Sequence, residues 1–462
     1  MVVQHNMQAA NANRMLNITT GAQSKSTEKL SSGYRINRAA DDAAGLSISE
    51  KMRKQIRGLD KASSNAEDGV SSVQTAEGAL TEVHSMLQRM NELAVQASNG
   101  TNSDTDRGAI QDEISQLTTE IDRVAETTKF NETYLLKGGN GTKDVYMNGH
   151  DAGLKGTLTD SATTATFKVA AGALDAGKSV TIGGKDYTIA STLDETKALA
   201  NAAVTDKKSF TVDDTKYNVA ADGKITKDGD ATATAVKVED IVKTGSKVSY
   251  DGKTLTAADI DTTTGVDKSD SSVISAAHAV DLMEKELTAA NNIGATKTAA
   301  TAEKAADYTS KDGVTFNITK GTAEVADKLS FSLHVGSDAD MTNKITVGIE
   351  TMNSSYLGIK GLNVNDDSGI AGTYAIDAIS DALQKVSEQR SSLGAVQNRL
   401  EHTIDNLDNV VENTTSAESR IRDTDMAEEM VNYSKNNILA QAGQSMLAQA
   451  NQSNQGVLSL LQ

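Results

Sequence analysis

Histidine is the residue type in this chain best suited to metal binding or acid–base catalysis, and none of the six stands in a catalytic pattern. No HExxH sequence, which would hold zinc from one helix face, and no GxSxG nucleophile elbow occurs. Cysteine is absent, which excludes disulfides, thiolate metal sites and a cysteine nucleophile. The sequence therefore predicts no catalytic residue, metal site or enzyme activity. The histidines are His5, His84, His150, His278, His334 and His402.

One phosphate-loop pattern is present, because Gly172 to Ser179 fit GxxxxGK[ST]. A working phosphate loop opens a helix whose N-terminus faces the phosphates. Lys178-Ser179 instead begins an alternating stretch, and it is repeated as Lys208-Ser209 without preceding glycines. We therefore expect a strand, a chance match and no nucleotide cofactor.

Asp338, Asp340 and Asn343 could suggest a calcium loop, but they lack the full spacing of an EF-hand. A polar hairpin turn is the favoured interpretation.

Two long segments of the chain carry apolar residues at regular helical spacing, and we call these two series of residues the apolar stripes. Steps of three and four residues that average 3.5 over many turns are typical of helices that supercoil around a partner. We therefore expect an N-terminal helix to pack against a C-terminal helix, with the middle of the chain inserted between them. The first stripe comprises Met52, Ile56, Leu59, Ala62, Ala66, Val70, Val73, Ala76, Leu80, Val83, Leu87, Met90 and Ala94. The second comprises Ile376, Ile379, Leu383, Val386, Arg390, Leu393, Gln397, Leu400, Ile404, Leu407, Val411, Thr414, Glu418 and Ile421.

Composition supports long helices and excludes several partners. The 462 residues include no proline, the residue that breaks helices. A net charge of −18 argues against nucleic-acid binding. No apolar run reaches the roughly 18 residues needed to span a membrane. The polar N-terminus lacks the apolar core of a secretory signal, which by itself would suggest a cytoplasmic protein.

Helix boundaries follow from caps and glycines. We expect a first amphipathic segment over residues 1–33 that ends at Gly33, a charged connector, and a long helix over 46–98. Asp104 or Thr105 is expected to cap a helix that ends near Thr128. A second long helix should run from Gly369 to about 422, followed by an amphipathic segment over 424–462.

The middle of the chain has a different composition, rich in Thr, Ala, Asp, Gly and Lys. Alternating segments around Gly183-Gly184, Asp213-Asp214 and Asp251-Gly252 predict three β-hairpins. Helices are expected near 193–204, 239–244 and 272–292. A further hairpin is expected over 329–350.

Long runs at both ends of the chain resemble one known family. The N-terminal run from Leu30 to Leu59 reads LSSGYRINRAADDAAGLSISEKMRKQIRGL, and the similarity continues to Ser103. The C-terminal run from Arg390 to Leu407 reads RSSLGAVQNRLEHTIDNL, followed by SRIRDTDMAEEM and SNQGVLSLL. These runs resemble bacterial flagellin over about 140 N-terminal and 130 C-terminal residues.

The resemblance implies a mainly α fold with an α+β insert. Long antiparallel coiled-coil-like helices from both termini would form a rod with a β-hairpin at 329–350. Residues 1–45 and 423–462 would form inner-tube helices and a spoke connector, and 46–142 and 326–422 the rod domain. The segment that precedes the outer domains in well-known enterobacterial flagellins here follows the insert, so residues 143–325 are expected to be the variable surface-exposed domain or domains.

The resemblance also implies three sets of functional residues. A convex surface would serve contacts between subunits first and would be read secondarily, in the monomer, by Toll-like receptor 5. Asn91 stands where the best-known flagellins have a second arginine. The convex-surface residues are Gln88, Arg89, Leu93, Gln96 and Glu113. The inner-tube residues are Met7, Met15, Ile18, Ile438, Ala442, Met446, Val457, Leu460 and Leu461, and the spoke residues are Arg35, Arg38, Asp41 and Asp42.

The function implied by the resemblance is that of a self-assembling filament subunit, secreted to the bacterial flagellum and conferring motility. The implied partners are further copies of the chain, the flagellar type III export apparatus and its chaperone, and the cap and hook-junction proteins. No membrane insertion is expected. A hook-filament junction protein, or a secreted adhesin with its function in the insert, are the alternatives.

Overall fold

The computed structural model describes residues 6–229, 235–304, 313–366 and 369–459, with side chains up to residue 453. The chain divides into two compact units. The first contains Met1–Ser71, Ser332–Val347 and Val396–Gln462, and the second contains Ser72–Phe331 and Gly348–Ala395. Two long helices, α2 (Ala43–Ala97) and α8 (Ile370–Arg422), contribute residues to both units.

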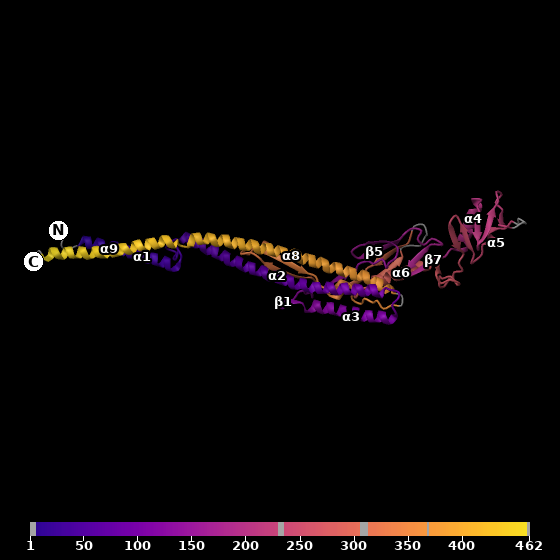
Figure 1. The fold of residues 1–462 in the computed structure, drawn as a ribbon, viewed down its shortest axis with the longest axis horizontal. Helices are drawn as coiled ribbons and strands as arrows, with labels where there is room; N and C mark the ends of the chain where they lie inside the picture. The colour runs from indigo at the N-terminus through magenta and orange to yellow at the C-terminus, as the bar shows by residue number, and fades with distance from the viewer. Residues whose placement is uncertain (1–5, 230–234, 305–312, 367–368, 460–462) are drawn as a thin grey trace. The chain divides into compact units, whose positions relative to one another are not determined.

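In the first unit, helix α1 (Met7–Ser32) lies antiparallel to helix α9 (Met426–Ser459) (Figure 1). The amide of Asn6 donates to the carbonyl of Ala450 at 3.2 Å, and Lys29 Nζ lies 3.7 Å from Glu429 Oε2 at the other end of the pair. The expected stop at Gly33 is confirmed, because this residue has φ 75° and its N–H donates to the Lys29 carbonyl.

The same unit holds the beginning of α2 against the end of α8. Leu59 and Ala62 pack on Leu407, and one step further Ala66 packs on Leu400, so the two helices run antiparallel. A two-stranded sheet joins this core through Ile345 and the half-buried side chains beside it. The sheet consists of β17 (Leu329–His334) and β18 (Lys344–Ile349), with a short 3₁₀ turn, Met341–Asn343, before the second strand. The expected hairpin at 329–350 is therefore confirmed.

In the second unit, the end of α2 lies against the beginning of α8 at Gly372, and side chains of α3 (Asp104–Thr127) are bonded to α2. The prediction that Asp104 or Thr105 caps α3 is wrong by one residue. Ser103 is the cap, because its hydroxyl accepts from the N–H of Asp106 at 3.3 Å while the Asp106 carboxylate accepts from the N–H of Ser103 at 3.1 Å. Three short elements accompany α3: β1 (Lys129–Phe130), β2 (Thr133–Tyr134) and α7 (Ser354–Leu357).

The two ends of the middle region are joined by backbone pairing. Strand β3 (Thr142–Tyr146) pairs antiparallel with β16 (Thr322–Ala326) over the length of both strands. Ala323 and Val325 are buried with Met147, and Tyr356 of α7 packs against them. The chain thus leaves for the middle region and returns from it at neighbouring positions.

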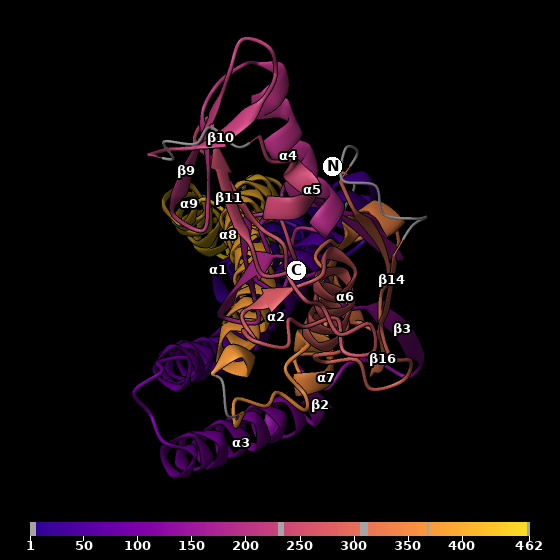
Figure 2. The ribbon, with the colours of Figure 1, turned by 90° about the vertical axis from the view of Figure 1, so that its right-hand side faces the viewer.

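The middle region contains a first hydrophobic core around two sheets and helix α6 (Ala276–Asn291). Phe167 and Phe316 are fully buried, with ring centroids 6.5 Å apart, and α6 covers the larger sheet along β14 (Figure 2). Tyr374 of α8 joins this core. The larger sheet has the order β14 (Thr301–Lys304), β15 (Thr315–Thr319), β5 (Thr164–Val169), β4 (Gly156–Asp160); the smaller has the order β13 (Val273–Ile274), β7 (Lys185–Ile189), β6 (Ser179–Ile182).

A second core in the middle region is separate from the first. It is built on a five-stranded sheet covered by helix α4 (Leu193–Thr205), with Phe210, Val212 and Val248 buried between them. The short helix α5 (Val238–Ile241) closes one side. The strand order is β10 (Ile225–Lys227), β9 (Thr215–Val219), β8 (Phe210–Val212), β11 (Lys247–Tyr250), β12 (Lys253–Thr256).

The predicted fold class, mainly α with a β-rich middle, is confirmed. So are the three hairpins β6–β7, β8–β9 and β11–β12. The helix expected over 272–292 begins later, because Val273–Ile274 form strand β13 and Ser275 caps α6. Strands β3, β4, β5, β14, β15 and β16 were not predicted. Within the described residues, no helix is both long and apolar enough to cross a membrane.

Candidate functional site

Helices α1 and α9 expose apolar side chains that nothing in the described chain covers. Ser26 is the one fully buried residue of α1, so the helix pair has almost no core of its own. We call the exposed set the terminal apolar surface. It comprises Met7 (73% exposed), Met15 (55%), Ile18 (59%), Met426 (47%), Met430 (59%), Val431 (68%), Ile438 (66%), Leu439 (51%) and Met446 (62%).

Most of the residues expected to line an inner tube belong to this surface, and Ala442 is exposed beside them. Leu460 and Leu461 lie outside the described residues, and the side chain of Val457 is likewise not described. Sequence reasoning missed Met430, Val431 and Leu439, which line a shallow groove of about 590 Å³ together with Ile438. Met430 and Val431 lie eight and seven residues before Ile438, about two helical turns, and this spacing was the available signal.

The four spoke residues of the first unit are each bonded within the chain. Arg35 donates from its backbone N–H to the Arg422 carbonyl and from Nη2 to the Ile421 carbonyl, both at 2.6 Å. Arg38 Nε lies 2.9 Å from Glu28 Oε1. The backbone N–H of Arg38 donates to the Asp41 carboxylate and lowers the pKa of that group. Asp42 accepts from the N–H of Gly45 at 2.8 Å and so caps α2.

Tyr34 organises this connector, a role that no pattern in the sequence predicted. Two guanidinium groups lie over its ring, that of Arg422 at 4.8 Å and that of Arg53 at 5.5 Å from the ring centroid. Arg53 Nε lies 3.2 Å from Glu418, and Arg422 lies 2.9 Å from Glu50. The turn between α1 and α2 is thereby tied to the turn between α8 and α9.

The convex-surface residues lie in the second unit. The Arg89 guanidinium donates from Nε to Glu113 Oε1 at 2.8 Å and lies 3.2 Å from Glu92, and the bond to Glu113 raises the pKa of Arg89. The Arg89 side chain is 49% exposed, and Gln88 and Gln96 are exposed on α2.

Leu93, the apolar member of the convex-surface set, is only 2% exposed. The structure therefore brings Arg89 and Glu113 together at the surface and places Leu93 in the core beneath them.

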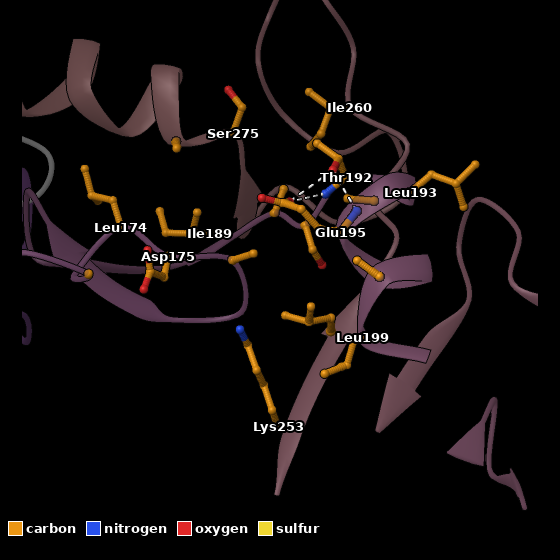
Figure 3. A pocket seen from close by; sticks show the side chains of 18 of the residues that line it. Leu174, Asp175, Ile189, Thr192, Leu193, Glu195, Leu199, Lys253, Ile260 and Ser275 are labelled. Carbon is orange, nitrogen blue, oxygen red and sulfur yellow. Dashed lines mark hydrogen bonds between the residues drawn. The ribbon is translucent and has the colours of Figure 1, made fainter. Parts of the chain in front are cut away.

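The phosphate-loop-like segment borders a hollow of about 1120 Å³ in the middle region (Figure 3). Lys178 directly precedes strand β6 rather than a helix, as expected. The N–H of Glu195 at the start of α4 is already bonded to Thr192. Three carboxylates and the single ammonium of Lys253 line the hollow, a charge balance that repels phosphate. The carboxylates are Asp175, Glu195 and Asp259.

Within the described part of the chain, no group of three or more His, Cys, Asp or Glu side chains has the arrangement of a metal site. Asp338, Asp340 and Asn343 instead form a polar turn. Asp340 accepts from the N–H of Thr342, and the Asn343 amide donates to the Asp338 carbonyl.

Comparison with protein families places both ends of the chain. Residues 3–141 match the bacterial flagellin N-terminal helical region, and residues 376–461 match the bacterial flagellin C-terminal helical region. The middle region, with its two cores, lies outside both matches.

Similarity to individual proteins extends over the whole chain. A flagellin of Clostridium tyrobutyricum is 41% identical and covers 98% of this chain and 100% of its own length. A flagellin of Bacillus subtilis (strain 168) is 36% identical with full coverage of both chains, at 100% each. Among solved structures, FliC from Burkholderia pseudomallei matches 72% of this chain and 99% of its own at 21% identity, with a TM-score of 0.27. The chain therefore belongs to the bacterial flagellin family.

Proposed function

We propose that the chain is the repeating structural subunit of a bacterial flagellar filament, secreted from the cell, and that its polymer serves motility. Family membership supports this function. The observation that carries the assembly mechanism is the terminal apolar surface on α1 and α9. Large apolar side chains exposed in such number on two adjacent helices usually mark an interaction site.

A second copy of the chain is the partner that the surface fits. Head-to-tail contacts between unlike surfaces of identical chains generate a ring if the rotation closes and an open helix if it does not, and an open helix can grow without limit. Apolar burial then supplies the driving force that the α1–α9 pair lacks on its own. The long unbroken helices α2 and α8 would give such a polymer its stiffness.

The remaining partners follow from the same proposal. A filament subunit made inside the cell must reach the growing end, which requires the flagellar export apparatus and its chaperone. Growth at that end requires a cap, and attachment at the base requires the hook-junction proteins. The absence of proline suits rapid folding on arrival, since no slow X-Pro isomerisation intervenes.

Charge placed on the terminal apolar surface tests the assembly mechanism. Ile438→Asp and Met446→Asp should each abolish or strongly reduce seeded filament growth, because a carboxylate would be buried without a partner. Electron microscopy and sedimentation after seeding would measure this. Ala202→Asp is the matched control, since Ala202 is an exposed helical residue in the middle region. Normal filaments from both α9 variants would overturn the role of this surface.

We further propose that the exposed Arg89–Glu113 pair marks a surface that contacts neighbouring subunits in the filament and is read by Toll-like receptor 5 in the free monomer. The supporting observation is that both side chains are more than two-fifths exposed while paired with each other. A rigid, exposed arginine is a common anchor of protein interfaces. Leu93, buried below, would hold the backbone of this surface in place.

Arg89→Ala should reduce receptor activation by the monomer by about tenfold or more, as expected for an interface anchor. A receptor reporter assay with purified monomer measures it. Arg123→Ala is the control, because Arg123 is similarly exposed on α3 but pairs with Glu120 instead. An equal response from both variants would contradict the receptor proposal and leave the assembly proposal intact.

A further inference from the structure

Methionine is concentrated on the two terminal helices and is exposed there. Five of the 13 methionines lie on α1 and α9, and we call them the terminal methionines. They are Met7 (73% exposed), Met15 (55%), Met426 (47%), Met430 (59%) and Met446 (62%).

Elsewhere methionines are mostly placed as core residues. Met90, Met147, Met283 and Met352 are at most 3% exposed. Met341, in the turn between β17 and β18, is 74% exposed. Among the described residues it is the exposed methionine that does not belong to α1 or α9.

The thioether of an exposed methionine is readily oxidised by peroxides. In this reaction the peroxide O–O bond breaks and an S–O bond forms, so that sulfur loses two electrons and the peroxide is reduced to water. The chain has no cysteine, and no thiol of its own therefore competes for the oxidant. The product, methionine sulfoxide, carries a strongly polar S=O group in place of an apolar one.

We infer that the terminal methionines are oxidation sites that control whether a subunit can assemble: sulfoxide on α1 or α9 excludes the subunit from the polymer. This inference rests on the proposed function, in which the terminal apolar surface is buried between subunits. A buried sulfoxide without a hydrogen-bond donor is unfavourable, as is any unpaired polar group in an apolar contact. A thiol-dependent methionine sulfoxide reductase would reverse the change, since it removes the oxygen as water while its thiols become a disulfide.

Free and assembled subunits therefore differ in how readily their terminal methionines are oxidised. In the monomer the terminal methionines are open to solvent, whereas in the polymer they are covered. Oxidation therefore acts on subunits before incorporation and spares those already in the filament.

The first experiment uses the unaltered full chain. Purified monomer is partly oxidised with hydrogen peroxide, seeded, and separated into filament and soluble fractions, and peptide mass spectrometry then measures sulfoxide at each methionine. Sulfoxide at the terminal methionines should be depleted by about tenfold in the filament fraction. Sulfoxide at Met341 should be equally abundant in both fractions. Equal distribution at all six sites would overturn the inference.

An untreated sample separates the two proposals. If untreated monomer does not polymerise on seeds, the proposed function fails. If untreated and oxidised monomers polymerise equally, the function stands and the oxidation inference fails.

A variant with all five terminal methionines changed to Leu provides the second test, because leucine conserves volume and helix propensity but is not oxidised. The amount of filament that this variant forms should be the same with and without a peroxide dose that stops the unaltered chain, whatever its own level of assembly, whereas Met341→Leu should remain sensitive. Peroxide sensitivity equal to that of the unaltered chain would overturn the inference. If the variant does not assemble even without peroxide, the inference is tested by the first experiment, in which equal sulfoxide in the filament and soluble fractions of the unaltered chain would overturn it.

Discussion

Arg107 and Arg123 lie on the same helix, α3, but only Arg107 is buried. Its side chain is 4% exposed, and its Nε donates to the Ala97 carbonyl at 3.1 Å, close to the end of α2. The last carbonyls of a helix have no partner within it, so Arg107 satisfies a group that would otherwise be buried and unpaired. Arg123, with a side chain 60% exposed, pairs only with Glu120 one turn away.

Replacing each arginine by Met should separate these two roles. Arg107→Met leaves the Ala97 carbonyl without its donor and should lower the free energy of unfolding by about 1–3 kcal/mol. Arg123→Met should change it by less than about 0.5 kcal/mol, as is usual for an exposed site. Urea unfolding of the monomer, followed by circular dichroism, measures both. Equal effects of the two substitutions would contradict the capping role of Arg107.

Single residues were predictable where their role depends on local sequence, and not where it depends on distant partners. Gly33 was identified as a helix end because left-handed backbone there favours glycine. Tyr34 was missed because the cations around its ring, Arg53 and Arg422, come from far along the chain. The burial of Leu93 below Arg89 likewise depends on packing that spacing alone does not reveal.

At the scale of elements, the first apolar stripe predicted the buried face of α2 well. From Leu59 to Ala94 every stripe position is buried except Val70, which is half-buried. The second stripe was less accurate at the start of α8, where Ala375, Ala378 and Ala382 are buried and Ile376 and Leu383 are half-buried. Small residues are buried there because the backbones of α2 and α8 approach closely, a feature that hydrophobic periodicity does not encode.

Gly372 of α8 lies close to the backbone at the end of α2. A Cβ atom at this position would lie 2.8 Å from the Ser98 N and 3.0 Å from the Ala94 O, both backbone atoms that cannot move aside. Gly372→Ala should therefore displace the start of α8 and destabilise the second unit by about 1–3 kcal/mol. Gly394→Ala is the control on the same helix, because no atom lies within 4 Å of its added Cβ.

The control substitution, Gly394→Ala, should increase the free energy of unfolding of the monomer by up to about 1 kcal/mol, since alanine favours helix more than glycine does. Thermal unfolding of both variants beside the unaltered chain measures the difference. If Gly372→Ala were as well tolerated as Gly394→Ala, the close contact between α2 and α8 would not exist in solution.

For the whole molecule, the sequence predicted helical ends and a middle that contains strands, but not the construction of that middle. Its strands are short and rich in threonine and lysine, so several of them, including β4 and β14, have no clear apolar alternation. Their pairing connects distant segments, as when β5 pairs with β15 about 150 residues later. Local patterns revealed the hairpins β6–β7 and β8–β9, but not that the middle region has two cores.

The pairing of β3 with β16 provides a precise test of whether the middle region is dispensable for assembly. Residues 147–321 can be replaced by a short Gly/Ser turn, because Tyr146 and Thr322 lie opposite each other in the ladder. Tyr374, now 6% exposed within the first core, would lose its cover, and Tyr374→Ser should accompany the deletion.

The shortened chain should be exported, should form thinner filaments and should activate Toll-like receptor 5 as a monomer, because every residue proposed for these roles lies outside the deleted segment. Secretion assays, electron microscopy and the receptor reporter measure the three outcomes. A shortened chain that is exported and folded but forms no filaments would mean that the middle region supplies essential contacts between subunits, and the proposed assignment of assembly to the terminal helices would be incomplete.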